Sequence, residues 1–107
     1  MTERPDVEVE SDAVMAFIRA NQASVLSDSL DSLEASSLED LPRTVHAIHG
    51  SLGSYQLHSA HELIAALATL LADPATAPEA ARTAQLQTVA ALRAQLPALR
   101  TSSEQHA

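Results

Sequence analysis

Histidine is the residue type in this chain that offers the most chemistry. The chain has five histidines and no cysteine, and four of the histidines form two H-x-x-H pairs, His46 with His49 and His58 with His61. A neutral imidazole is a nucleophile, and two imidazoles at positions i and i+3 of a helix can share a Zn²⁺, Cu²⁺ or Ni²⁺ ion. The pairs therefore raise two alternatives, a nucleophilic histidine and a histidine-based metal site. The second pair straddles an expected helix start, which works against convergence of all four rings on one ion, and His106 lies in the expected C-terminal tail.

Both glycines of the chain, Gly50 and Gly53, lie close to the first histidine pair. In a helix interior each costs about 1 kcal/mol relative to alanine, so their placement in one turn requires a reason. His46 and Gly50 are i and i+4, and therefore share one face of a helix. We expect Gly50 to expose the His46 imidazole by removing a side chain that would crowd it. The alternative is that the glycines only permit close helix packing and His46 is an ordinary surface residue.

The helix that carries His46 is expected at about residues 41–56. Its apolar residues recur at spacings of three and four, which is typical of a helix with one buried face: Leu41, Val45, Ile48, Leu52 and Tyr55. Asp40 is a suitable N-cap, and Pro42 is tolerated in the first turn, where its missing N–H has no helical partner. His46 lies about 100° around the axis from Val45, so we predict that it faces solvent.

Three further helices are expected from the same periodicity. The first spans about residues 12–35, with Asn21 leaving open a division into a short extra N-terminal helix and a longer one. Its apolar face consists of Val14, Phe17, Ile18, Val25, Leu26, Leu30 and Leu33. Residues 59–62 (SAHE) and 76–79 (TAPE) match capping boxes, so each predicts a helix start. The buried faces that follow are Leu63, Ile64, Leu67, Leu70 and Leu71 in one helix and Leu86, Val89, Leu92 and Leu96 in the other. Asp73-Pro74 should end the first of these helices, and Pro97 should end or kink the second.

Short connections between such helices predict an all-α fold, an up-down antiparallel four-helix bundle. A chain of 107 residues is long enough for one such domain with a single core. We expect the bundle to span residues 12–100, between an acidic, disordered N-terminal tail at 1–11 and a disordered C-terminal tail at 101–107. The initial methionine and the two tails favour a free-standing protein.

The composition excludes several classes of function. The net charge is −8, with six basic residues and no lysine; nucleic-acid and anionic-membrane binding both depend on clustered Lys and Arg. We see no signal peptide and no apolar stretch of membrane-spanning length. Together with the absence of cysteine, this predicts a cytoplasmic protein without disulfides or thiol chemistry.

Residues 46–55 (HAIHGSLGSY) resemble the signature of the histidine-containing phosphotransfer (Hpt) family of bacterial phosphorelays, which reads roughly His-x-Leu-Lys-Gly-Ser. The similarity extends in helix order from about Ala13 to Leu99. The resemblance implies that His46 is the phosphoacceptor and that Gly50 is the small residue that exposes it. It also implies that His49, in the place of the usual lysine, stabilises the phosphate. Gln56 stands where the family often has a second glycine.

By the same resemblance, the chain is a phosphoryl carrier rather than an enzyme acting alone. The expected partners are response-regulator receiver domains or a hybrid histidine kinase, and the chain is expected to be a monomer rather than a dimer. The chain itself binds no cofactor or metal on this interpretation, and the Mg²⁺ belongs to the partner receiver domain.

Two further alternatives fit the sequence. Because His49 replaces a lysine, the chain could be a degenerate adaptor that binds a kinase or receiver without accepting phosphate. Residues 59–63 (SAHEL) also faintly resemble the phosphoacceptor box of sensor kinases, which would make His61 the acceptor, but the basic residue and proline that follow in that box are missing.

Overall fold

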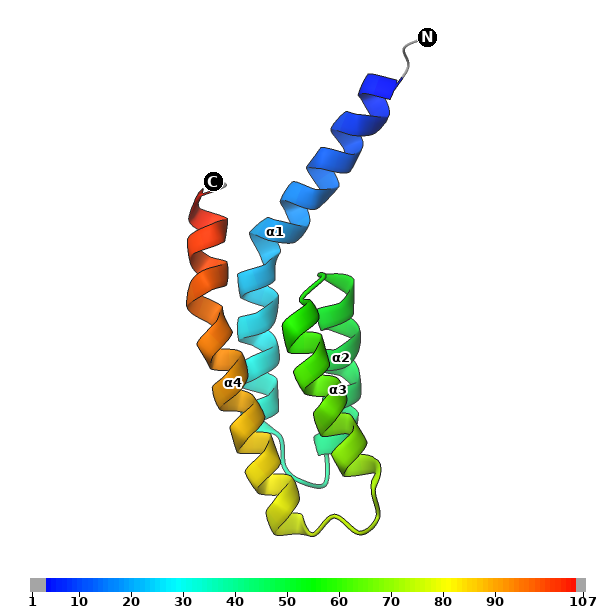
Figure 1. Ribbon diagram of the computed structural model, residues 1–107, viewed down its shortest axis with the longest axis vertical. Helices are drawn as coiled ribbons and strands as arrows, with labels where there is room; N and C mark the ends of the chain where they lie inside the picture. The colour runs from blue at the N-terminus through cyan, green and yellow to red at the C-terminus, as the bar shows by residue number, and fades with distance from the viewer. Residues whose placement is uncertain (1–3, 106–107) are drawn as a thin grey trace.

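The computed structural model describes residues 4–105, with side chains described for residues 12–100. It contains four α-helices: α1 (Arg4–Ala35), α2 (Leu41–Ser54), α3 (His58–Ala72) and α4 (Pro78–Gln105). There is no β-strand within the described part of the chain. Successive helices run in opposite directions (Figure 1). The protein is an all-α four-helix bundle, which confirms the predicted fold class.

The four helices close into a ring around one core. α1 packs against α4 and α2, and α3 packs against α2 and α4. Leucine supplies most of the core, which fits a helical composition because leucine combines high helix propensity with a large apolar side chain. The fully buried leucines are Leu26, Leu33, Leu41, Leu52 and Leu92.

The helix that carries His46 follows its predicted pattern. Leu41, Val45, Ile48 and Leu52 are all buried, and Tyr55 packs against the core while partly exposed. Asp40 occupies the N-cap position of α2, but its side chain makes no capping hydrogen bond. Its carboxylate instead binds Arg43 and the Ser37 hydroxyl, so the predicted side-chain cap is absent.

The turn between α2 and α3 is short and tightly bonded. The Leu57 N–H donates to the Leu52 carbonyl and the Gln56 N–H to the Gly53 carbonyl, the two bonds of a Schellman motif. That motif needs a left-handed residue, and here Gln56 fills it with φ of 59°. The side-chain amide of Gln22 donates to the Tyr55 carbonyl at 2.8 Å, which fixes the turn to α1.

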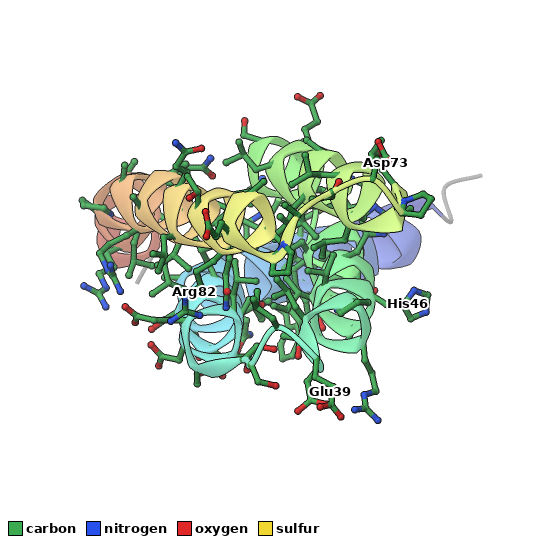
Figure 2. All side chains as sticks on the ribbon, turned by 90° about the horizontal axis from the view of Figure 1, so that it is seen from below. Glu39, His46, Asp73 and Arg82 are labelled. Atoms are coloured by element: carbon green, nitrogen blue, oxygen red, sulfur yellow. The ribbon has the colours of Figure 1, made fainter. Side chains whose placement is uncertain are left out.

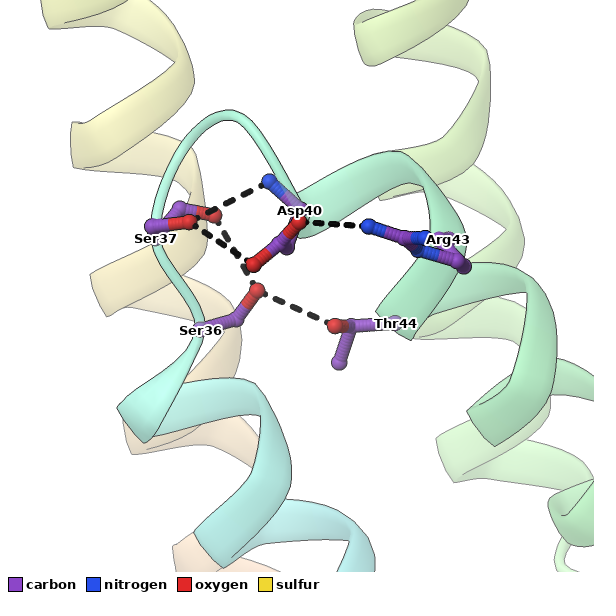
Figure 3. Close-up of polar contacts among 5 residues, drawn as sticks. All are labelled: Ser36, Ser37, Asp40, Arg43 and Thr44. Carbon is purple, nitrogen blue, oxygen red and sulfur yellow. Dashed lines mark hydrogen bonds and ion pairs between the residues drawn. The ribbon is translucent and has the colours of Figure 1, made fainter.

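The opposite end of the bundle is held by a polar cluster that runs from the buried Gln85 and Ser36 to the surface. We call it the polar clamp: Ser36, Ser37, Asp40, Thr44 and Gln85. Gln85 on α4 is fully buried, and its amide nitrogen donates to the carbonyls of Leu33 and Ser36 at 2.7 and 2.9 Å. Those carbonyls lie at the end of α1, where helical partners run out. The Ser36 and Thr44 hydroxyls bond at 3.0 Å, and the Ser37 hydroxyl accepts from the Asp40 N–H (Figure 3).

The first helix departs from its predicted bounds. α1 begins at Arg4 and is continuous through Asn21, so the helix is not divided into a short N-terminal helix and a longer one. Residues 4–11 of the predicted tail are therefore helical, and residues 1–3 lie outside the described residues. The Asn21 amide donates to the Phe17 carbonyl at 2.8 Å within the helix, which satisfies the side chain without a break.

The N-terminal half of α1 projects beyond the α2–α3 hairpin (Figure 1). Val14 and Phe17 are therefore 56% and 60% exposed, although their spacing predicts burial. The α2–α3 turn meets α1 at Gln22, so α1 residues before that point have passed the end of the α2–α3 hairpin. The apolar periodicity of α1 continues beyond the part of the helix that the α2–α3 hairpin covers.

Neither predicted capping box forms. α3 begins at His58 with Leu57 as its N-cap, because the Schellman turn leads directly into the helix, so Ser59 lies inside the first turn. The Thr76 hydroxyl donates to the Leu70 carbonyl at 2.8 Å and thus caps the end of α3 rather than the start of α4.

α4 does not end at Pro97 but continues to Gln105. Residues 101–105 of the predicted tail are therefore helical, and residues 106–107 lie outside the described residues. Leu96 and Leu99, on either side of Pro97, both pack against the core, and this packing offsets the proline's cost. Leu70 and Leu86, predicted as buried, are 36% and 47% exposed.

Within residues 4–105, no helix is long and apolar enough to cross a membrane.

Candidate functional site

His46 lies on the exposed side of α2. Its neighbour Val45 is 1% exposed, whereas His46 itself is exposed, as the helical angle between them predicts. Figure 2 shows the His46 ring pointing away from the bundle. Among the described residues, no side-chain hydrogen bond or ion pair engages this ring. One ring nitrogen of a neutral imidazole carries a lone pair, and at His46 it is accessible to a reactant from solvent.

A shallow groove of about 330 Å³ runs beside His46 between α2 and α3. The two histidines of the first pair, His46 and His49, border it on the α2 side. The rest of its lining is apolar: Pro42, Val45, Ala65, Ala68, Leu71 and Ala72. Small alanine side chains on α3 leave this space open, so the imidazole stands at the edge of an apolar surface.

The second ring of the pair, His49, does not stand alone. Its ring and that of His61 on α3 lie with their centroids 3.9 Å apart, tilted by 31°. Both residues are partly buried. The structure thus brings together one member of each H-x-x-H pair, and it leaves His58 exposed at the first residue of α3.

The two glycines have different surroundings. A Cβ added to Gly53 would lie 3.4 and 3.5 Å from the Cδ2 and Nε2 atoms of His61, so the imidazole packs over this backbone. A Cβ added to Gly50 would meet no atom within 4 Å. An added methyl group would therefore not touch the His46 ring, and that a larger side chain at residue 50 would crowd the ring stays a prediction. What Gly50 leaves open is space outside the chain, where a partner could approach.

Arg43 is a member of this surface that the histidine motif did not identify. It lies three residues before His46 on α2, and it is the sole arginine or lysine of the sequence between Arg19 and Arg82. Its guanidinium pairs with Asp40, and its side chain is 83% exposed. The signal in the sequence was the i−3 spacing from His46 in a chain without lysine. We call His46, His49, His61, Gly50 and Arg43 the histidine surface.

The metal alternative gains no ligand set from this arrangement. Within the part of the chain that the structure describes, no group of three or more His, Cys, Asp or Glu side chains is placed to hold an ion. His49 and His61 approach each other as stacked rings rather than with a third ligand beside them. His106 lies outside the described residues.

The histidine surface combines three chemical elements on one side of α2: an accessible nucleophile, donors one turn to either side of it, and an apolar edge. No family model, no curated protein and no solved structure matches this chain.

Proposed function

We propose that this chain is a phosphorelay intermediate that carries a phosphoryl group on His46 and exchanges it with an aspartate of a receiver domain. One observation supports this more than any other: the His46 ring is exposed and unbonded on a regular helix, beside the open position at Gly50. Phosphoryl transfer requires in-line approach and charge neutralisation and little other protein chemistry. An exposed imidazole with open space beside it suits such an approach.

The proposed step is a direct displacement at phosphorus. The unprotonated nitrogen of His46 forms a P–N bond as the P–O bond to the partner's aspartate breaks, and the electron pair of that bond returns to the carboxylate. The other ring nitrogen keeps its proton, so no base is required in this chain. The reverse step returns the phosphoryl group to an aspartate, which makes the chain a carrier rather than an enzyme acting alone.

Two side chains of the histidine surface would contact the transferred group, Arg43 to offset its negative charge and His49 to donate a hydrogen bond. Residues three apart on a helix are neighbours, with Cβ atoms about 5–6 Å apart, so His49 and Arg43 flank His46 from the next and the previous turn. An arginine offers up to five N–H donors to phosphate oxygens, and a neutral imidazole offers one. We propose that they take the role of the lysine of the Hpt signature, with Arg43 exchanging its surface ion pair with Asp40 for the phosphoryl group.

The proposed partner is a receiver domain, because transfer to and from His46 requires an aspartate and a Mg²⁺ ion in addition to the groups of the histidine surface. A receiver domain, free or within a hybrid histidine kinase of a bacterial, cytoplasmic relay, would supply the aspartate and the Mg²⁺. The groove beside His46 would receive apolar side chains of that domain, since its lining is mainly alanine, leucine, proline and valine. A monomer is sufficient for this role because every proposed group comes from one chain.

Incubation with a phosphorylated receiver domain tests the proposal. We expect the label to move from the receiver to this chain as an acid-labile phosphohistidine, and to disappear in His46→Gln. A His58→Gln variant is the matched control, because His58 is also exposed but lies at the start of α3. If receivers bind but no label moves in the wild type, the chain is an adaptor without phosphotransfer.

A further inference from the structure

The contact between His49 and His61 has a consequence for the proposed phosphoacceptor. A surface imidazole on a helix samples several staggered rotamers, and fixing one of them has an entropic cost each time a ligand requires it. The His49 ring, however, faces the His61 ring at a centroid distance of 3.9 Å. Packing of two flat rings restricts both χ angles of His49 before any phosphate is present.

His61 is itself held in place from two sides. Its ring lies on the backbone of Gly53, within 3.5 Å of the position that a Cβ would occupy, and it is partly buried between α2 and α3. The short Schellman turn fixes the axial position of α3 against α2, which sets the level at which His61 meets His49. A side chain larger than alanine at residue 53 would compete with the ring for this space.

We infer that His61 is a positioning residue: it holds the His49 imidazole beside His46 so that a His49 N–H meets the phosphoryl group without reorientation. The inference rests on the proposed function of His46 and assigns a role to a histidine that lies on another helix. His61 touches no reacting atom and acts only through His49.

Two measurements on the intact protein test this role. NMR of the imidazole ring protons should show a ring-current shift of the His49 resonances that is lost in His61→Ala, kept in His61→Phe, and unchanged in the His58→Ala control. The lifetime of phospho-His46 after removal of a phosphoramidate donor should fall about three- to tenfold in His61→Ala, as expected when a charge-assisted hydrogen bond loses its fixed geometry. His61→Phe should restore most of it.

A double-mutant cycle separates positioning from general structural damage. In a His49→Ala background, His61→Ala should have no further effect on the lifetime, since its action passes through His49. An equal loss in both backgrounds, or unchanged His49 resonances in His61→Ala, would overturn the role. If the wild type takes up no phosphoryl group at all, the proposed function fails and the positioning role falls with it, even where the NMR shifts show the stacked rings.

Discussion

The polar clamp and the histidine surface both involve α2, but they use polar side chains in opposite ways. In the clamp, Gln85 is fully buried and its amide nitrogen donates to two carbonyls at the end of α1. On the histidine surface, His46 is exposed and the imidazoles make no side-chain hydrogen bonds among the described residues. Buried polar groups must be paired within the fold, whereas exposed, unpaired donors remain available to a ligand. The difference indicates that the clamp stabilises the bundle, whereas the imidazoles of the histidine surface remain available to a ligand.

Gln85→Ala should have the largest effect on stability and almost none on function. It leaves the carbonyls of Leu33 and Ser36 without their donor and creates a cavity, which should cost about 2–4 kcal/mol in the free energy of unfolding. Urea denaturation followed by circular dichroism measures this, with the exposed Gln87→Ala as the control on the same helix. If Gln85→Ala unfolds like the wild type, or if the folded variant loses phosphotransfer, the clamp and the histidine surface do not have separate roles.

Gly50→Ala should change stability in the other direction. No atom lies within 4 Å of the added Cβ, so the variant gains helix propensity of about 1 kcal/mol without strain. We expect transfer from a receiver domain to slow severalfold while phosphorylation by a small phosphoramidate stays the same, because only the larger partner needs the space. Gly53→Ala is the control, since its added methyl group would lie against His61 inside the chain and should therefore affect transfer from both donors equally. Equal transfer rates from both donors would show that Gly50 does not serve partner access.

Arg43→Ala should leave stability nearly unchanged and weaken function. Its ion pair with Asp40 lies at the surface and is worth less than about 1 kcal/mol. Loss of its donors should shorten the lifetime of phospho-His46 about threefold or more, because hydrogen bonds from a cation to phosphate are stronger than neutral ones. Arg93→Ala removes a similar surface ion pair, with Glu34, and should not change that lifetime. A matching loss in both variants would point to net charge rather than to Arg43.

The sequence predicts those features of the site that depend on the geometry of a single helix. The spacing of Leu41, Val45, Ile48 and Leu52 predicted both the buried face of α2 and the exposure of His46. It was less informative where two helices meet. The contact of His61 with His49 depends on the axial position of α3 relative to α2, which the turn between them sets. That turn has Gln56 in the left-handed conformation instead of the usual glycine, so the sequence does not reveal it.

The errors at the termini have a common physical cause. Periodicity reports which face of a helix is apolar, but not how far its neighbours extend along it. Phe17 lies beyond the end of the α2–α3 hairpin and is exposed for that reason, and α4 passes Pro97 because Leu99 still finds the core. The role assigned to His46 remains a prediction, since the structure supplies its surroundings and not its chemistry.

The role of His46 as phosphoacceptor is tested most directly by the intact mass of the protein after incubation with a small phosphoramidate donor, beside the His46→Gln and His58→Gln variants. We expect a gain of one acid-labile phosphoryl group in the wild type and in His58→Gln, and none in His46→Gln. Phosphorylation that persists in His46→Gln, or a wild-type protein that stays unmodified with this donor and with a phosphorylated receiver, would contradict the claim that His46 carries the phosphoryl group.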